Sequence, residues 1–106
     1  MAKFLIQASY NAEGVRGLLK DGGTKRKKAA DELLQSVGAR VESFYFAFGD
    51  HDAYVIVEAP DNLSIAAASL AVTASGLVTT KTSVLLTPEE IDQATRKTPR
   101  YTPPGK

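Results

Sequence analysis

The chain has 106 residues, of which 43% are hydrophobic and 24% are charged, and this fits one globular domain. Its formal charge of +1 argues against a dedicated nucleic-acid-binding protein, and the absence of cysteine excludes disulfides, thiolate metal ligands and cysteine catalysis. A cytoplasmic protein without a membrane segment is expected, because residues 1–6 run directly into polar Gln7 and because the weakly polar run 63–72 is too short to cross a bilayer.

The first third of the chain predicts a strand followed by an interrupted helix. Residues 3–10 alternate between two faces, as in a strand, and Asn11 then provides an N-cap. The glycine pair at 22–23 costs about 2 kcal/mol relative to alanine inside a helix, so a break or kink is expected there. Helical spacing resumes over residues 30–37 and ends at Gly38, where a left-handed residue is typical.

The middle of the chain predicts a hairpin and a second helix. Residues 40–48 and 53–58 are strand-like, and the polar turn 49–52 joins them. A helix over about 63–75 follows. Its expected buried stripe consists of apolar and small residues at helical spacing, namely Leu63, Ala66, Ala67, Leu70 and Ala74.

The last third predicts a fourth strand over residues 77–86 and a short helix ending near Lys97. Thr87 and Glu90 form a capping-box pattern, which is the clearest local signal in the chain. The proline-rich segment 98–106 has no regular pattern. We therefore expect one domain over residues 1–97 and a C-terminal tail over residues 98–106.

The resulting order, β-α-β-β-α-β with a short C-terminal helix, predicts an α+β fold of the ferredoxin-like type. In that fold four antiparallel strands form one sheet and both long helices cover one face. A doubly wound parallel sheet would require a helix where the turn 49–52 stands.

Both faces of the predicted hairpin are apolar, which indicates a partner for the face that the helices leave open. One face of the first strand carries Phe44, Phe46 and Phe48, and the opposite face carries Val41, Tyr45 and Ala47. One face of the second strand carries Ala53, Val55 and Val57, and the opposite face carries Tyr54 and Ile56. An antiparallel sheet with one face in water is normally polar at alternate positions. We therefore expect two copies to pair sheet on sheet in a homodimer, with the tail contributing to a further contact between dimers.

The hairpin sequence Tyr-Phe-Ala-Phe-Gly-Asp-His-Asp and its surroundings resemble the GYD domain family. The likeness extends from residue 3 to about residue 91, and it is carried by residues 18–22, 45–62 and 81–91. Of the family's Gly-x-Tyr-Asp signature, Gly49 and Asp52 match, whereas His51 stands where tyrosine is usual. The resemblance implies a fold similar to the dimeric α+β barrels of the ferredoxin-like superfamily. Wider relatives include cofactor-free monooxygenases, haem enzymes, isomerases and plain binding modules.

The one histidine, His51, is the candidate acid-base residue, with Asp50 or Asp52 orienting it. The competing interpretation is structural, since aspartate and histidine are common in turns and Asp52 can accept backbone N–H groups there. No metal site is expected, because these three residues are adjacent and no second histidine exists. No cofactor motif is present, and no cofactor is expected.

Candidate ligand-cavity residues are the aromatics and one arginine of the strands: Tyr10, Tyr45, Phe46, Tyr54 and Arg40. The aromatics have a packing interpretation as well, as core or interface side chains. The basic run 25–28 follows a glycine pair without the spacing of a nucleotide-binding loop. It is either a solvated helix face or a weak anion contact.

Two functions remain open on the sequence. One is a non-catalytic oligomeric module that binds a small molecule or serves a structural role, because no nucleophile-base pair or paired catalytic carboxylates can be identified. The alternative is a cofactor-independent enzyme, monooxygenase- or isomerase-like. It would act on a small apolar compound held between sheet and helices, with His51 as acid or base. An enclosed aromatic cavity opening near His51 would favour the enzyme, and a His51 that points to solvent would favour the binding module.

Overall fold

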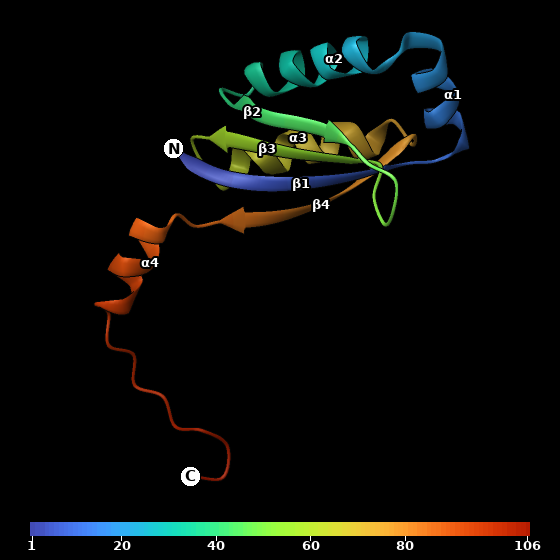
Figure 1. Cartoon of the computed structure of the whole chain (residues 1–106). Coiled ribbons are helices and arrows are strands. Elements are labelled where there is room, and N and C mark those ends of the chain that lie inside the picture. Colours follow the sequence, from blue (N-terminus) through green and yellow to red (C-terminus); the bar gives the residue numbers. More distant parts are fainter.

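A computed structural model describes residues 1–106 and shows one four-stranded antiparallel sheet with helices packed on it (Figure 1). The elements in chain order are β1 (Ala2–Tyr10), α1 (Ala12–Asp21), α2 (Gly23–Gln35), β2 (Arg40–Phe46), β3 (Ala53–Ala59), α3 (Asn62–Ala74), β4 (Val78–Leu85) and α4 (Pro88–Thr95). The strands lie in the order β2-β3-β1-β4. The predicted α+β fold of ferredoxin-like type is confirmed.

Local chemistry sets the ends of the helices. The Asn11 side chain accepts the Gly14 N–H at 2.9 Å and begins α1. Gly22, with φ of 81°, separates α1 from α2, so the predicted break is confirmed. The capping box at Thr87 is also confirmed: its hydroxyl accepts the Glu90 N–H at 3.1 Å, and the Glu90 carboxylate accepts the Thr87 N–H at 2.9 Å.

The core lies between the sheet and the helices α2 and α3. Its buried members include Phe4, Leu34, Val55, Val57 and Ile65. The predicted buried stripe of α3 is wrong: Leu63 and Leu70 are 79% and 71% exposed, whereas Ile65 and Ala68 are buried. This helix is small and apolar nearly all round, so its periodicity does not distinguish a buried face and contact with the sheet decides it.

A β-bulge in β2 changes which side chains face the helices. The register of β2 against β3 shifts between Val41 and Ser43, so that Val41 lies opposite Val57 and Phe44 lies opposite Val55. Val41 and Phe44 consequently both pack against the core. The expectation that they lie on opposite faces is wrong, because the extra residue of the bulge reverses the alternation.

The face of the sheet away from the helices, which we call the open face, is charged at one end. The Lys3 ammonium lies 2.6 Å from Glu42 and 3.3 Å from Glu58, and the Arg40 guanidinium lies 2.8 Å from Glu58. The hydrogen bond from Arg40, followed by that from Lys3, holds the pKa of Glu58 below its usual value, and Glu42 chiefly raises the pKa of Lys3. This end of the open face is therefore less apolar than the sequence analysis expected.

Beyond this end the open face carries apolar and then aromatic side chains, and the polar Gln7 and the exposed Lys81 lie in the same row as Tyr54. Leu5 lies opposite Ile56 in the centre of the sheet. Tyr45 lies opposite Tyr54 one row further on, and Tyr45 is 72% exposed.

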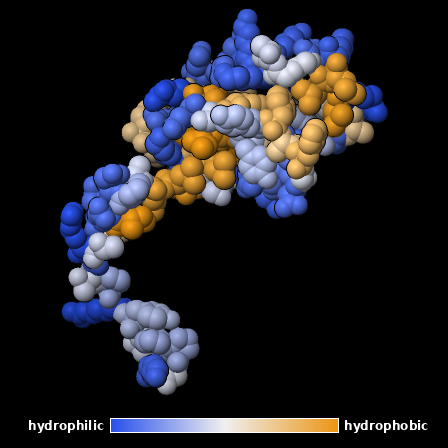
Figure 2. All heavy atoms as spheres, in the orientation of Figure 1, coloured by the Kyte–Doolittle hydropathy of each residue, from blue (hydrophilic) through white to orange (hydrophobic).

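The chain beyond β4 projects away from the rest of the molecule (Figure 1). Hydrophobic atoms gather where β4 leads into α4 (Figure 2), and the exposed apolar side chains there are Val84, Leu86 and Ile91. Residues 98–104 carry no regular structure. Every helix is too short or too polar to cross a membrane.

Candidate ligand-binding cavity

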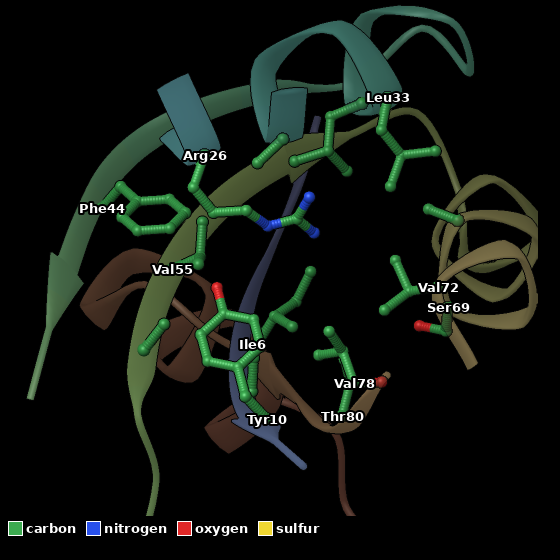
Figure 3. A pocket seen from close by; sticks show the side chains of 15 residues that line it. Ile6, Tyr10, Arg26, Leu33, Phe44, Val55, Ser69, Val72, Val78 and Thr80 are labelled. Atoms are coloured by element: carbon green, nitrogen blue, oxygen red, sulfur yellow. The ribbon is translucent and has the colours of Figure 1, made fainter. Parts of the chain in front are cut away.

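A cavity of about 70 Å³ lies between the inner face of the sheet and the helices α2 and α3 (Figure 3). Fifteen residues line it, and twelve of them are hydrophobic. All four strands contribute to its wall, and so do both helices. The cavity is thus built into the main packing layer of the fold and is partly open to solvent.

The cavity exists because small side chains face one another across this layer. Ala8 and Ala53 line it from the sheet, and Ala30 and Ala68 line it from α2 and α3. A ligand that filled it would recover the dispersion contacts that these walls lack.

The three polar residues of the wall are Arg26, Ser69 and Thr80, and Tyr10, counted among the twelve hydrophobic ones, adds a hydroxyl. Figure 3 shows the Arg26 side chain extending from α2 among the apolar groups, with Tyr10 rising from β1 on the other side. Arg26 is half-buried and makes no ion pair. The site therefore combines an apolar pocket with one cation and a few hydroxyls.

His51 lies across the sheet from this cavity. Its Nδ1 is 3.0 Å from the Ser9 hydroxyl, and its ring stands edge-on to Tyr54 with the ring centres 6.0 Å apart. Ala8 and Tyr10 face the cavity, so Ser9 between them faces the open side. His51 is half-buried on the open face, where a molecule in the cavity cannot reach it.

Asp52 connects the turn to the end of β1. Its carboxylate accepts the Tyr10 N–H at 2.8 Å, its own N–H donates to the Ala8 carbonyl at 2.8 Å, and its carbonyl accepts the Ala47 N–H at 2.8 Å. The carboxylate thus bonds a backbone N–H of β1 instead of one within the turn. No hydrogen bond joins it to His51, whose partner is Ser9.

Gly49, the other residue that matches the family signature, has a φ of 150°, a conformation that glycine adopts without strain. Asp50, on the other side of His51, is exposed. No group of three histidine or carboxylate side chains lies close enough together to hold a metal ion.

The other predicted ligand-cavity residues are divided between the two faces. Tyr10 lines the cavity, whereas Phe46, Tyr45, Tyr54 and Arg40 do not. Phe46 lies on the inner face beside α2. One of its ring carbons is 3.0 Å from the position that a β-carbon on Gly23, the first residue of that helix, would occupy. The two tyrosines lie on the open face near His51, and Arg40 belongs to the charged end.

Two residues that the sequence analysis did not single out occupy notable positions. Ser9 is the hydrogen-bond partner of His51, and Arg26 is the charged group at the cavity. A signal for Arg26 was present, because Arg26, Ala30 and Leu33 or Leu34 recur at the spacing of one helix face.

The fold and the cavity define a ferredoxin-like α+β protein with a pocket between sheet and helices. Comparison with protein families matches residues 4–95 to the GYD domain, and the chain belongs to the GYD domain family. The resemblance expected from the hairpin sequence is confirmed. Searches of curated proteins and of solved structures found no match.

Proposed function

We propose that this GYD-domain protein is a non-catalytic homodimeric binding module that holds a small, largely apolar molecule between its sheet and its helices. The observation that carries this proposal is the 70 Å³ cavity, whose lining is hydrophobic at twelve of fifteen positions. Pockets of this kind, with few polar groups on a mainly apolar wall, are typical of small-molecule sites. The position of His51 across the sheet supports binding over catalysis at this cavity.

The open face supports the homodimer. At its charged end, Lys3 and Arg40 neutralise Glu42 and Glu58 within one copy, so the ion pairs bring no unpaired charge to an interface. Leu5 and Ile56 at the centre of the sheet, with Tyr45 and Tyr54 beside them, supply apolar contact area. Lys81, in the row of the two tyrosines, is exposed and forms no ion pair within one copy. In a dimer with a two-fold axis, the open face of one copy would pack against the open face of the other.

Binding in the cavity is tested by methyl NMR of the full chain under xenon pressure and with neutral 1-butanol. The proposal expects shifts concentrated at Leu33, Val72 and Val78, which line the cavity, and saturation as the probe concentration rises. The variant Ala30→Leu, which fills the space from α2, should lose these shifts while remaining folded. Absence of any shift at the cavity methyls with both probes would refute the proposal.

The homodimer is tested by light scattering and analytical ultracentrifugation at several concentrations. A dimer that dissociates when Ile56 is replaced by lysine on the open face would support the sheet-on-sheet arrangement. The matched control is Leu63→Lys, which places the same charge at an exposed position of α3. A chain that stays monomeric at high concentration, or a dimer that only the control disrupts, would contradict the arrangement.

The alternative function is a cofactor-independent enzyme that uses His51 as acid or base on a small apolar compound. It is favoured by the 3.0 Å separation of the Ser9 hydroxyl and His51 Nδ1, which is within the range of a nucleophile and its base. The substrate would then lie on the open face. If turnover of any compound is found, His51→Ala should abolish it, and unchanged turnover in His51→Ala and His51→Tyr would remove this alternative.

A further inference from the structure

The cavity contains one formally charged side chain, and that side chain has no acidic partner. In the basic run of α2, Lys25 lies 3.4 Å from Asp21 and Lys27 lies 3.0 Å from Asp31. Arg26 between them is half-buried at the cavity wall and pairs with no carboxylate. Lys28 is exposed, so water solvates its charge. Of the four cations, Arg26 alone combines loss of water with lack of a counter-charge.

We propose that the cavity binds a small monocarboxylate, with the carboxylate on the Arg26 guanidinium and a short apolar tail against the alanine-lined walls. This inference rests on the proposed function of the cavity as a binding site and specifies its ligand class. A guanidinium presents paired N–H donors that match the two oxygens of a carboxylate. One cation in the wall matches one negative charge.

The remaining lining favours a carboxylate over a phosphate. The wall offers only the hydroxyls of Tyr10, Ser69 and Thr80 beside Arg26, and its other positions are apolar. A phosphate carries up to two charges and three acceptor oxygens, and phosphate sites usually collect backbone N–H groups or several cations. A carboxylate with a hydrocarbon tail needs one cation and apolar surroundings, which is what this wall provides.

The volume limits the length of the tail. At about 70 Å³ the cavity is less than half of the roughly 150 Å³ that accommodates benzene in an engineered apolar cavity. A tail of a few carbon atoms therefore fits without rearrangement of the walls. Butyrate is a suitable probe, and butyramide is its neutral counterpart of nearly equal size and shape.

The test is an NMR titration of the full chain with sodium butyrate and with butyramide at pH 7, at constant ionic strength. Butyrate is ionised at this pH. We expect saturable shifts at the cavity methyls with both probes and at least tenfold tighter binding of butyrate, which corresponds to about 1.4 kcal/mol. The variant Arg26→Gln should bind both probes equally. The control Lys28→Gln, which removes one charge from an exposed position of α2, should keep the preference.

The outcomes separate this inference from the function on which it rests. Equal binding of butyrate and butyramide by the unmodified chain would overturn the carboxylate assignment and leave the cavity as a neutral apolar site. A preference that persists in Arg26→Gln would overturn the role of the arginine. Failure of xenon, butanol, butyramide and butyrate alike to shift the cavity methyls would refute binding itself. The comparison of the two probes on the unmodified chain needs no variant, so misfolding of Arg26→Gln cannot leave the inference undecided.

Discussion

Removal of the Asp52 carboxylate should destabilise the protein measurably, because that group completes the edge of the sheet where the strand ladder ends. β1 extends to Tyr10, whereas the pairing of β1 with β3 ends at Ala8 opposite Ala53. The Tyr10 N–H points toward β3 beyond the last strand residue, and the Asp52 carboxylate accepts it at 2.8 Å. In Asp52→Ala this donor loses its protein partner.

The expected loss follows from the type of bond. Hydrogen bonds to charged groups contribute roughly 1.5–3 kcal/mol. Asp52 is half-buried and keeps some contact with water, which places it at the lower end, at about 1.5 kcal/mol. For a domain of this size that corresponds to a decrease in Tm on the order of 10 °C. Asp52→Asn keeps an acceptor oxygen but loses the charge, so we expect about half of this effect.

The assay is urea unfolding followed by circular dichroism, at a fixed protein concentration because dimerisation would couple stability to concentration. Amide hydrogen exchange at Tyr10 provides a local readout, and its protection should fall more than that of Phe4 in the core. The matched control is Asp50→Ala in the same turn, where the carboxylate is exposed and a change within about 0.5 kcal/mol is expected. Equal stability of Asp52→Ala and Asp50→Ala would refute the reasoning.

Three further predictions concern α1, the charged end of the open face and the tail. Gly14→Ala should destabilise the fold, because a β-carbon there would lie 2.6 Å from the Leu77 carbonyl oxygen. Gly17→Ala in the same helix places its β-carbon near nothing within 4 Å and should stabilise the fold by up to about 1 kcal/mol. Equal effects of the two variants on thermal unfolding would contradict this prediction. Stability should fall as the pH drops below about 4.5, because the pKa of Glu58 in the folded protein lies below its usual 4.5. The stabilisation from the Glu58 ion pairs is complete above the usual pKa and is lost as the pH falls through the folded pKa. Glu58→Gln should reduce this fall in acid titrations, and an unchanged profile would exclude the contribution. Removal of residues 98–106 should leave the dimer intact by light scattering, and a monomer would show that the tail holds the copies together.

The sequence was sufficient where structure depends on neighbours a few residues apart. The capping box at Thr87 and Glu90 and the break at Gly22 are confirmed, because hydrogen bonds within one turn and the backbone freedom of glycine set them. The antiparallel pairing of β2 with β3 followed from the short turn 49–52, which leaves no room for the crossover that a parallel pair needs.

The sequence was insufficient where a partner from elsewhere in the chain decides. The bulge beside Val41 has no local signature, and it moves that side chain from one face of the sheet to the other. In α3 the choice of Ile65 over Leu63 as a buried residue follows from contact with the sheet. Helical periodicity cannot make that choice in a helix that is small and apolar on every side.

The same limitation explains which part of the site was missed. Tyr10 could be singled out, because aromatic strand residues are visible in the sequence, and it lines the cavity. Arg26 could not be separated from Lys25, Lys27 and Lys28 by composition, since a basic run usually forms a solvated face. Its spacing to Ala30 and Leu33 places it on one face of α2, but only the tertiary structure shows that this face turns toward the cavity. Lys25 pairs with Asp21 at the end of α1, and Lys27 pairs with Asp31 in α2.

The residues at the Gly-x-Tyr-Asp signature positions do not line the cavity, which lies on the inner face of the sheet. Asp52 fixes the turn to β1 through a backbone hydrogen bond, so its effect on the cavity passes through the position of Tyr10. His51, which replaces the usual tyrosine, lies on the open face against Ser9 and Tyr54. In the proposed dimer this position belongs to the surface between the two copies. A change of His51 should therefore alter the association of the copies before it alters binding in the cavity, whereas a change of Arg26 should do the reverse.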